Sequence, residues 1–367
     1  MSSLPANKRS PTITDVAAAA KVSRATVSRA FSQPHLLSAE TVARVTAVAA
    51  QLGYVPNHTA RALSTGRAGN LALMVPDIGN PFFTALMRGV QTRALEADYA
   101  TFLGDSDENP ELEDVLIAKL SAQVDGLIFA APRLSDEALT AHAHRKPLVL
   151  INRDLPNIPR ILIDTASTYA VAMEHLISLG HRSIAYVEGP PLAWSNAQRL
   201  KAVRSVARKH GIRLIRIPTA RPTFECGQAS VRELIDSGIT GALAYDDLMA
   251  QGIMAGLASH GLSVPDDMSV IGCDGVLATR AYPPLTSITV HCAEAGEQAV
   301  DLLTDLLQGR AASSTTRLVL PTEFVIRATT APPPRGHAHG MLPRTEPNDT
   351  PAQDFTRGDS ATHPRTE

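Results

Sequence analysis

The sequence is poor in cysteine and contains no long hydrophobic run. Its 367 residues include three cysteines, Cys226, Cys273 and Cys292, which lie far apart and form no CxxC pair. This spacing excludes a disulfide framework and a cysteine-rich zinc site, and it is typical of proteins of a reducing cytosol. No apolar run reaches the roughly 18–20 residues that a membrane-spanning helix needs, and the first residues lack the apolar core of a secretory signal. We therefore expect a cytoplasmic protein without a membrane partner.

Sequence motifs of common enzyme active sites are also absent. The chain contains no P-loop, no GxSxG, no HExxH and no phosphate-binding GxGxxG. The adjacent carboxylates Asp246 and Asp247 resemble the acid pair of a hydrolase, but the neighbouring sequence supplies no partner for them. We expect neither an enzyme nor a bound cofactor.

Residues 12–31 carry the pattern of two short helices joined by a tight turn. Thr14 and Ser23 are the expected N-caps, because each hydroxyl can accept a hydrogen bond from the free N–H groups of a first helical turn. A third amphipathic helix is expected to begin at Ser38 and to end at Gly53. Apolar residues at i, i+3 and i+4 predict the buried faces of the three helices. These residues are Ile13, Val16 and Ala17, then Val27, Ala30 and Phe31, then Val42, Val45, Val48, Ala49 and Leu52.

The charge distribution indicates what this segment binds. Residues 1–67 hold eight Lys or Arg and two acids, a net charge of +6, and because the whole chain carries −2 the remainder carries −8. A small basic domain on an acidic body is typical of phosphate binding by DNA-binding proteins. Three short helices suffice for a helix-turn-helix domain, in which the first turn of the second helix contacts base edges. The alternative is an ordinary helical hairpin whose exposed arginines are only solvated.

From residue 70 the pattern changes to short apolar runs that alternate with helices. This alternation predicts parallel sheets with helices on both faces, in two similar α/β lobes. Strands are expected at 71–76, 100–103, 126–129 and 148–151, and then at 183–187, 212–217, 242–245 and 269–272. Helices are expected at 82–97, 111–120, 136–143, 166–179, 197–210, 227–237, 248–260 and 293–307, with a last strand pair within 317–327.

The residues after Thr330 are rich in Pro, Arg, Thr, His, Asp and Gly and show almost no apolar periodicity. We interpret residues 331–367 as a disordered tail. His337 and His339 in this tail could bind a metal, but an unstructured polar tail is the simpler interpretation, and we expect no metal site.

Several segments that occur in a fixed order resemble the lactose-repressor (LacI/GalR) family of bacterial transcription regulators. The resemblance covers about residues 11–330. It rests on the helix pair at 12–31 and on segments 53–63 (GYVPNHTARAL), 75–83 (VPDIGNPFF), 175–185 (HLISLGHRSIA), 264–274 (VPDDMSVIGCD) and 284–288 (PLTSI). The ordered recurrence of these segments is more specific than any one of them.

The resemblance implies an all-α helix-turn-helix head with a hinge helix, followed by an α/β two-lobed core of the type I periplasmic-binding-protein kind. In such a core the chain crosses between the lobes three times, here near Ile163, Thr289 and Leu320, so that helix 293–307 returns to the first lobe. The expected division is a disordered arm at 1–10, the head at 11–56, the hinge at 57–68 and the core at 69–330. Within the core, the first lobe comprises about 69–163 and 290–319, and the second about 164–289 and 320–330.

The resemblance also implies which residues contact DNA. Arg24 and Ala25 match the base-reading positions: Arg24 can bind guanine through two hydrogen bonds, and Ala25 can touch a thymine methyl. Leu63 matches a leucine that wedges into the minor groove once the short hinge folds on DNA. Phosphate or rim contacts are expected from Thr12, Ser23, Thr26, Ser28, Arg29, Ser32, Tyr54 and Asn57.

A small ligand is expected in the cleft between the lobes, at the carboxyl ends of the strands. Asn80 and Phe82 follow the first strand, and Arg199 and Asp274 match the family's ligand-binding arginine and acid. Two positions depart from the family. Asp246 stands where many relatives have asparagine, and it disfavours an acidic ligand unless it serves only as a helix N-cap. Pro222 replaces a common stacking aromatic, which Trp194 could supply instead. These features favour a neutral sugar or nucleoside.

The sequence thus predicts a homodimeric repressor that binds a pseudo-palindromic operator in double-stranded DNA and responds to a small effector. An activator, or a global regulator without an effector, remains the alternative within the same fold. A free solute-binding protein would need an export signal and no basic head. No leucine heptads follow residue 330, so we do not expect a coiled-coil tetramer.

Overall fold

The computed structural model describes residues 11–55, 67–310 and 315–334. The expected N-terminal arm, the hinge positions Asn57 and Leu63, and residues 335–367 of the expected tail lie outside these residues. The tail was expected from residue 331, which is too early, because Ala331 belongs to the second lobe: its N–H donates to the Ser269 hydroxyl at 3.0 Å, and its carbonyl oxygen lies 2.9 Å from His181 Nε2. No helix in the described ranges is long and apolar enough to cross a membrane.

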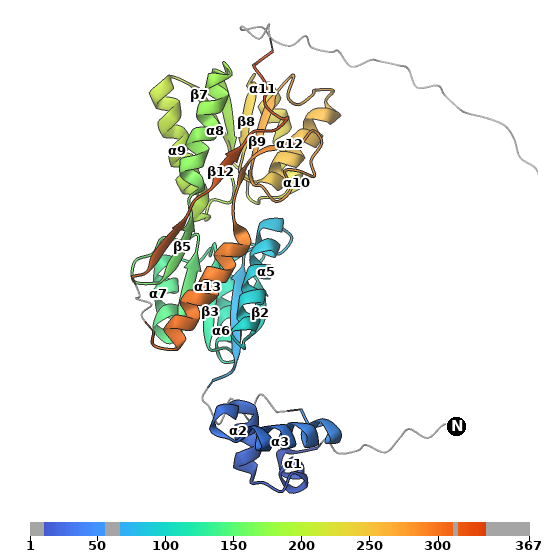
Figure 1. Ribbon diagram of the computed structural model, residues 1–367. Helices are drawn as coiled ribbons and strands as arrows, with labels where there is room; N and C mark the ends of the chain where they lie inside the picture. The colour runs from blue at the N-terminus through green and yellow to red at the C-terminus, as the bar shows by residue number, and fades with distance from the viewer. Residues whose placement is uncertain (1–10, 56–66, 311–314, 335–367) are drawn as a thin grey trace, which may run out of the picture. The chain divides into compact units, whose positions relative to one another are not determined.

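The N-terminal part is a small helical domain (Figure 1). It consists of α1 (Ile13–Ala19), α2 (Arg24–Ser32), the short 3₁₀ helix η1 (Pro34–Leu36) and α3 (Ala39–Leu52). The three α-helices pack on one small apolar core, which confirms the predicted buried faces with two exceptions. Val42 is only partly buried and lies outside this core, and Leu52 is 41% exposed at the end of α3. The core residues are Val16, Ala17, Ala20, Val27, Ala30, Val45 and Ala49.

The helix ends follow from capping residues. The Ser23 hydroxyl accepts a hydrogen bond from the Thr26 N–H at 3.0 Å, and Gly53 ends α3 with a φ of +69°, a conformation that glycine adopts without strain. The prediction for α1 was wrong by two residues: its N-cap is Thr12 rather than Thr14. The Asp15 carboxylate accepts from both the N–H and the hydroxyl of Thr12, each at 2.7 Å, because only a cap three residues upstream allows this reciprocal pairing.

The first lobe is a six-stranded, fully parallel sheet of order β11-β5-β4-β3-β1-β2. Its helices are α5 (Pro81–Glu96), α6 (Pro110–Ser121), α7 (Asp136–Arg145) and α13 (Cys292–Leu307). Its strands are β1 (Asn70–Val75), β2 (Ala100–Asp105), β3 (Gly126–Ala130), β4 (Leu148–Ile151), β5 (Arg160–Ile163) and β11 (Arg317–Leu320). Strands β1, β3, β4 and β5 are almost entirely buried, as expected for a sheet covered by helices on both faces.

The second lobe repeats this architecture, with sheet order β12-β10-β9-β8-β6-β7. Only β12 runs antiparallel, next to β10. The strands of the second lobe are β6 (Ser183–Val187), β7 (Arg213–Ile217), β8 (Gly241–Ala244), β9 (Ser269–Asp274), β10 (Thr286–Thr289) and β12 (Glu323–Val325). Its helices are α8 (Thr165–Ser178), α9 (Trp194–His210), α10 (Phe224–Ala229), α11 (Val231–Asp236) and α12 (Asp247–Ser259).

The chain passes between the two sheets three times (Figure 1). The passages lie between β5 and α8, between β10 and α13, and between β11 and β12. The two strands expected within 317–327 are present, but they do not pair with each other: β11 pairs with β5 of the first lobe and β12 with β10 of the second, as the expected crossing near Leu320 implies. The predicted single helix at 227–237 was wrong: the chain forms the two short helices α10 and α11, which meet at Ser230.

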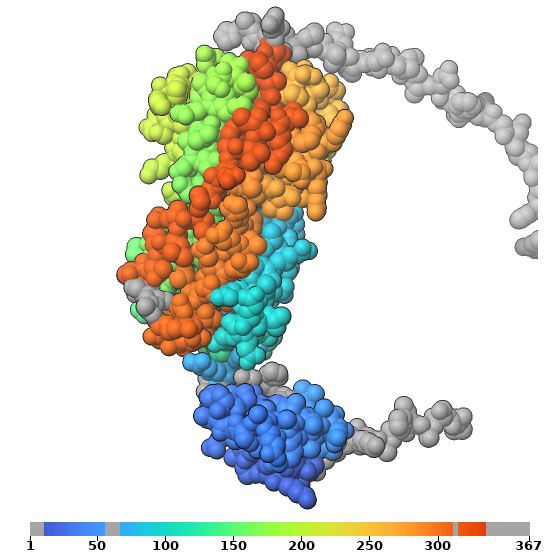
Figure 2. All heavy atoms as spheres, in the orientation of Figure 1, coloured from blue at the N-terminus to red at the C-terminus, as the bar shows by residue number. Residues whose placement is uncertain are grey.

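Each lobe contains one helix pair that approaches closely at glycine. In the first lobe α13 packs against α5, and their surfaces lie side by side in Figure 2. A Cβ at Gly89 would lie 2.0 Å from the Ala293 carbonyl oxygen. In the second lobe α10 packs against α12, and a Cβ at Gly252 would lie 2.0 Å from the Phe224 carbonyl oxygen. Any larger side chain at either glycine would push the two helices apart.

Candidate functional site

The outer face of α2 presents two arginines to solvent. Arg24, in the first turn, and Arg29 are both exposed, and within residues 11–55 neither forms an ion pair. Ala25 beside them is exposed as well. Because Ser23 caps the helix and Val27 anchors its inner face in the core, these side chains lie on a fixed helical surface.

Several hydroxyl side chains near α2 form hydrogen bonds within the helical head. The Ser23 and Thr26 hydroxyls lie 2.9 Å apart, and the Ser32 hydroxyl donates to the Ser28 carbonyl oxygen at 2.9 Å. Thr12 bonds to Asp15 at the start of α1, and the half-buried Tyr54 packs against Phe31 with ring centroids 6.1 Å apart. These residues flank α2 or anchor the elements beside it.

A cavity of about 30 Å³ lies between the two lobes, at the carboxyl ends of the strands. This volume leaves room for about one water molecule. Five of the six residues predicted to bind a ligand line it: Asn80, Phe82, Arg199, Asp246 and Asp274. They come from separate segments of both lobes, as sequence reasoning expected for a cleft site.

Asn80 and Asp246 face each other across this cavity, and both are buried. The Asn80 side-chain oxygen accepts from the Phe82 N–H at 3.0 Å and so caps α5, while its amide nitrogen donates to Asp246 at 2.9 Å. Asp246 in turn caps α12, because its other oxygen accepts from the Met249 N–H at 2.8 Å. Asp246 therefore both caps a helix and lines the cavity, which unites the two interpretations drawn from the sequence.

Arg199 is buried in the wall of the cavity. Its Nε donates to the Thr165 hydroxyl at 2.9 Å and its Nη1 to the Tyr245 carbonyl oxygen at 2.6 Å. Its guanidinium lies over the Tyr245 ring, 4.5 Å from the centroid, and 5.2 Å from that of Tyr169. None of these partners is a carboxylate, so the charge of Arg199 is available to a polar ligand.

Three buried acids, Asp246, Asp247 and Asp274, lie near one another, and Asp274 is also close to Arg199. Burial, reinforced by the nearby Asp274 carboxylate, raises the pKa of Asp246 to about 8 and that of Asp247 to about 7. Burial also raises the pKa of Asp274, although the Arg199 charge opposes that shift. Asp247 does not line the cavity: it accepts from the Ser287 hydroxyl at 2.6 Å and from the Leu277 N–H at 3.1 Å, and so ties α12 to the sheet. Asp246 and Asp274 are therefore the two acids that line the cavity and can contact a ligand.

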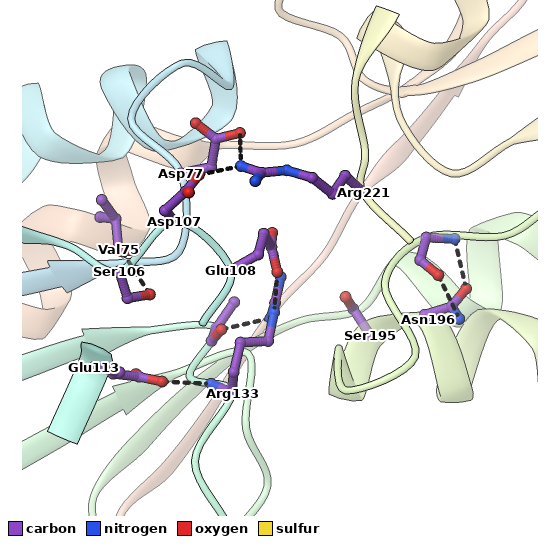
Figure 3. Close-up of polar contacts among 12 residues, drawn as sticks. Val75, Asp77, Ser106, Asp107, Glu108, Glu113, Arg133, Ser195, Asn196 and Arg221 are labelled. Carbon is purple, nitrogen blue, oxygen red and sulfur yellow. Dashed lines mark hydrogen bonds and ion pairs between the residues drawn. The ribbon is translucent and has the colours of Figure 1, made fainter. Parts of the chain in front are cut away.

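Sequence reasoning missed a second arginine, which lines the first-lobe side of the cavity (Figure 3). Arg133 forms two hydrogen bonds to Glu108, at 2.5 and 2.9 Å, and its backbone N–H donates to Glu113 at 2.9 Å. Burial raises the pKa of Glu113 to about 7. Its position in the sequence could have identified Arg133, since it follows the buried strand β3 and the carboxyl ends of parallel strands lie at one edge of the sheet.

Arg221 of the second lobe reaches across to the first lobe (Figure 3). It forms an ion pair with Asp107, and its Nη2 lies 3.9 Å from the Asp77 carboxylate. Arg221 is more exposed than the groups of the cavity, with 39% of its side chain accessible. This contact links the lobes at a second point, beside Pro222, which itself lines the cavity.

Trp194, the sixth residue predicted to bind a ligand, does not line this cavity. It is the first residue of α9 and faces a separate hollow beside β5 and β11. Tyr245, which the sequence analysis did not single out, is the aromatic residue stacked on Arg199. Within the described ranges, no three His, Cys, Asp or Glu side chains come together as a metal site.

Two family models match the chain. Residues 12–57 match the model described as "Bacterial regulatory proteins, lacI family", and residues 173–330 match "Periplasmic binding protein-like domain". The chain is also 32% identical over 328 residues to the HTH-type transcriptional repressor CytR of Escherichia coli (strain K12), which covers 87% of this chain and 96% of CytR.

Solved structures of LacI-family proteins also match the chain. The lac repressor dimer bound to operator and the anti-inducer ONPF matches 88% of this chain and 100% of its own, with a TM-score of 0.78 and 28% identity. A LacI family transcriptional regulator from Enterococcus faecium with bound ribose matches 72% of this chain and 99% of its own, with a TM-score of 0.65 and 30% identity. The resemblance therefore extends over both the helical head and the two-lobed core.

Proposed function

Since the chain belongs to the LacI family of ligand-modulated, DNA-binding transcription regulators, we propose that it is a cytoplasmic repressor that binds a pseudo-palindromic operator as a homodimer. We further propose that a neutral sugar or nucleoside in the cleft sets its operator affinity. The observation that carries the first part is Arg24, which lies exposed on the first turn of the capped helix α2 and forms no ion pair within residues 11–55.

At the DNA end, Arg24 binds guanine O6 and N7 through two hydrogen bonds, an interaction worth about 1–3 kcal/mol of discrimination. Ala25 contacts a thymine methyl. Arg29 and the surrounding hydroxyl residues bind phosphates and fix the register of the head on the duplex. The support is geometric, because Arg24, Ala25 and Arg29 are all exposed on α2.

A selection from a random double-stranded DNA pool identifies the operator, and gel-shift titrations of variants then test the roles. Arg24→Ala should weaken specific binding and relax the preference at one base pair per half-site. Leu63→Ala should weaken specific binding but spare non-specific binding, because the minor-groove wedge acts only at the centre of the site. Equal affinity of Leu63→Ala and the unaltered protein for the selected site would contradict the wedge.

At the ligand end, the groups lining the cavity suit hydroxyls. Asn80 and Asp274 accept hydrogen bonds, and the planar fork of Arg199 suits a pair of hydroxyls. Burial raises the pKa of Asp246 and so favours its protonated form, which can donate as well as accept a hydrogen bond. The concentration of acids disfavours an anionic ligand, so the proposal is a neutral, hydroxyl-rich molecule.

The dimer is supported by apolar side chains at the edge of the first sheet. Strand β2 is an edge strand, and its Phe102 and Leu103 are each 37% exposed, while Leu95 of the adjacent α5 is 78% exposed. Soluble monomers rarely leave such a group uncovered on an edge strand, and a second copy would bury it. Sedimentation of the purified chain tests this directly.

An activator or an effector-independent regulator of the same fold is the second candidate. A thermal-shift screen of sugars and nucleosides, followed by gel shifts with and without each hit, separates these possibilities. Stabilisation by a hit that also changes operator affinity supports the ligand-gated regulator. A hit-free screen, with operator binding intact, supports the effector-independent one.

A further inference from the structure

One segment of the second lobe carries only positive charge. Residues 194–217, which contain α9 and β7, hold seven Lys or Arg and no Asp or Glu, although the chain after residue 67 carries a net charge of −8. The proposed ligand site uses one of the seven, Arg199, so six cations are left that the proposed function does not use. These six are Lys201, Arg204, Arg208, Lys209, Arg213 and Arg216.

Four of these cations line an open groove of about 790 Å³ between α9 and β7, two neighbouring elements of the second lobe (Figure 1). Lys201, Arg204 and Arg208 lie three and four residues apart and so form one stripe of α9. All three are exposed, and among the described residues none of them has an ion-pair or hydrogen-bond partner. Arg216 of β7 is instead paired with the buried Glu188, at 2.5 and 3.1 Å. The stripe therefore presents three positive charges that no described acid compensates.

The floor of the groove is apolar. Leu200 of α9 and Leu214 of β7 are only half-buried, so part of this apolar surface meets water. An apolar floor beside a row of cations suits a polypeptide with both apolar and acidic side chains, because burial of an apolar side chain there is favourable. The backbone of a nucleic acid supplies phosphates for the cations but no apolar group for the floor. The apolar lining residues are Ala197, Leu200, Ala207, Ile212 and Leu214.

Strand β7 ends the second sheet, and no described strand pairs with its outer edge. Toward β6, the Arg213 N–H donates at 3.0 Å and the Ile217 carbonyl oxygen accepts at 2.8 Å. Because alternate residues of a parallel strand bond to the same neighbour, the backbone groups of Leu214 and Arg216 point away from β6. Such an edge can pair with an extended segment of another chain. A second copy of β7 is unsuited, since the basic side chains of the two copies would repel each other.

We propose that the groove and the edge of β7 bind an extended, acidic segment of another protein. Its backbone pairs with Leu214 and Arg216, one apolar side chain packs on Leu200 and Leu214, and its carboxylates lie along the α9 stripe. The stripe is about 10 Å long, at about 1.5 Å per helical residue, which matches about three residues of extended chain. Two carboxylates on alternate residues therefore reach it together. The surface is separate from the cleft and from the helical head, so the inference goes beyond the proposed function.

The probe is a fluorescently labelled nine-residue peptide with Leu at its centre, Glu at the other four odd positions and Thr at the even ones. It is titrated into the full-length protein and followed by anisotropy. Binding should saturate and should weaken as salt rises, because exposed charges are screened. Replacement of the four Glu by Lys should abolish binding, and replacement of the central Leu by Ser should weaken it at least fivefold.

Two further peptides test the backbone pairing. One is methylated at the backbone nitrogens of its odd positions and the other at those of its even positions. Since only alternate residues of an added strand face β7, one version should lose at least tenfold in affinity and the other should keep most of it.

Arg204→Glu tests the groove on the protein. Lys209→Glu is the matched control, because it makes the same change in charge on the same helix but lies outside the groove, where its side chain is 68% exposed. Arg204→Glu should weaken peptide binding at least fivefold and Lys209→Glu less than twofold. Both variants should bind the selected operator as the unaltered protein does.

Absence of saturable binding by the acidic peptide overturns the inference, and so does an equal loss in the two variants. Equal affinity of the Leu and Ser peptides, or equal effects of the two methylation patterns, overturns it as well. An unrelated DNA duplex that binds Arg204→Glu more weakly than Lys209→Glu would identify the groove as a nucleic-acid surface instead. None of these results bears on the proposed operator or effector, which have their own tests.

Discussion

Asn80 and Asp246 connect the two lobes through a hydrogen bond of 2.9 Å between residues that each begin a helix. Each uses one side-chain atom to cap its own helix and the other to reach across the cleft. Because both side chains are already held by their caps, the bond forms with little further loss of rotamer freedom. The hydrogen bond therefore ties the first turn of α5 in the first lobe to the first turn of α12 in the second.

Two substitutions at Asn80 separate these roles. Asn80→Ala removes cap and bridge, and should lower the free energy of unfolding by about 0.5–2 kcal/mol, the usual value of an N-cap. Asn80→Ser retains a capping hydroxyl but does not reach Asp246, so its stability should stay near that of the unaltered protein. Both should bind the effector several-fold more weakly in calorimetry. Full effector affinity in Asn80→Ser would show that the bridge has no part in closure.

The raised pKa of Asp247, about 7, makes stability depend on pH. The folded state retains a proton that the unfolded carboxyl releases near its ordinary value of 3.8, so this contribution is complete below pH 3.8 and is lost as pH rises through about 7. Asp247→Asn cannot titrate. In urea unfolding, its stability relative to the unaltered protein should therefore improve from pH 6 to pH 8.5, and a constant difference would contradict the assignment.

Arg221 stabilises the closed arrangement through Asp107 and Asp77, at a partly exposed site. Such exposed pairs contribute little and are screened by salt. Arg221→Ala should therefore weaken effector binding by at most about fivefold, chiefly through faster dissociation, and the effect should shrink in 0.5 M salt. Arg232→Ala, which removes an exposed pair within α11, is the control and should leave the dissociation rate unchanged.

The close approach of α5 and α13 makes Gly89 intolerant of a side chain. A Cβ there would lie 2.0 Å from a backbone oxygen, which cannot move without shifting α13. Gly89→Ala should therefore cost about 1–3 kcal/mol of stability in denaturant unfolding, as overpacking does. Gln91→Ala, at an exposed position of the same helix, should change stability by less than about 0.5 kcal/mol. Similar curves for both variants would show that the helices can separate without cost.

Most elements could be predicted because their apolar periodicity is strong and their capping residues are local. The strands that sequence analysis missed, β5 and β10, are four residues long and begin with a polar residue, so they carry almost no periodic signal. The sheets that β11 and β12 join carry no local signal and could be inferred only from the family resemblance. The two strands lie close in sequence, but which sheet each joins depends on partners more than 30 residues away.

The cleft residues also divide into those that local sequence or family motifs predict and those that depend on distant parts of the fold. Arg199 and Asp274 could be assigned from the family resemblance, and the structure brings both to one cavity. Arg133 carries no motif, and its place in the cavity depends on how β3 ends relative to its neighbours. Trp194 and Ser195 are adjacent in sequence, but only Ser195 lines the cavity, because consecutive helical residues point about 100° apart.

The three passages between the lobes also set the order in which the chain can fold during synthesis. The second lobe has all its strands except the short β12 within residues 183–289, so almost its whole sheet can form as soon as that stretch has emerged. The first lobe must wait for α13 and β11, which follow β5 by more than 120 residues. Its apolar face against α13 therefore stays uncovered while the second lobe is made. A ribosome that stalls between β10 and α13 leaves the first half of the core dependent on chaperones.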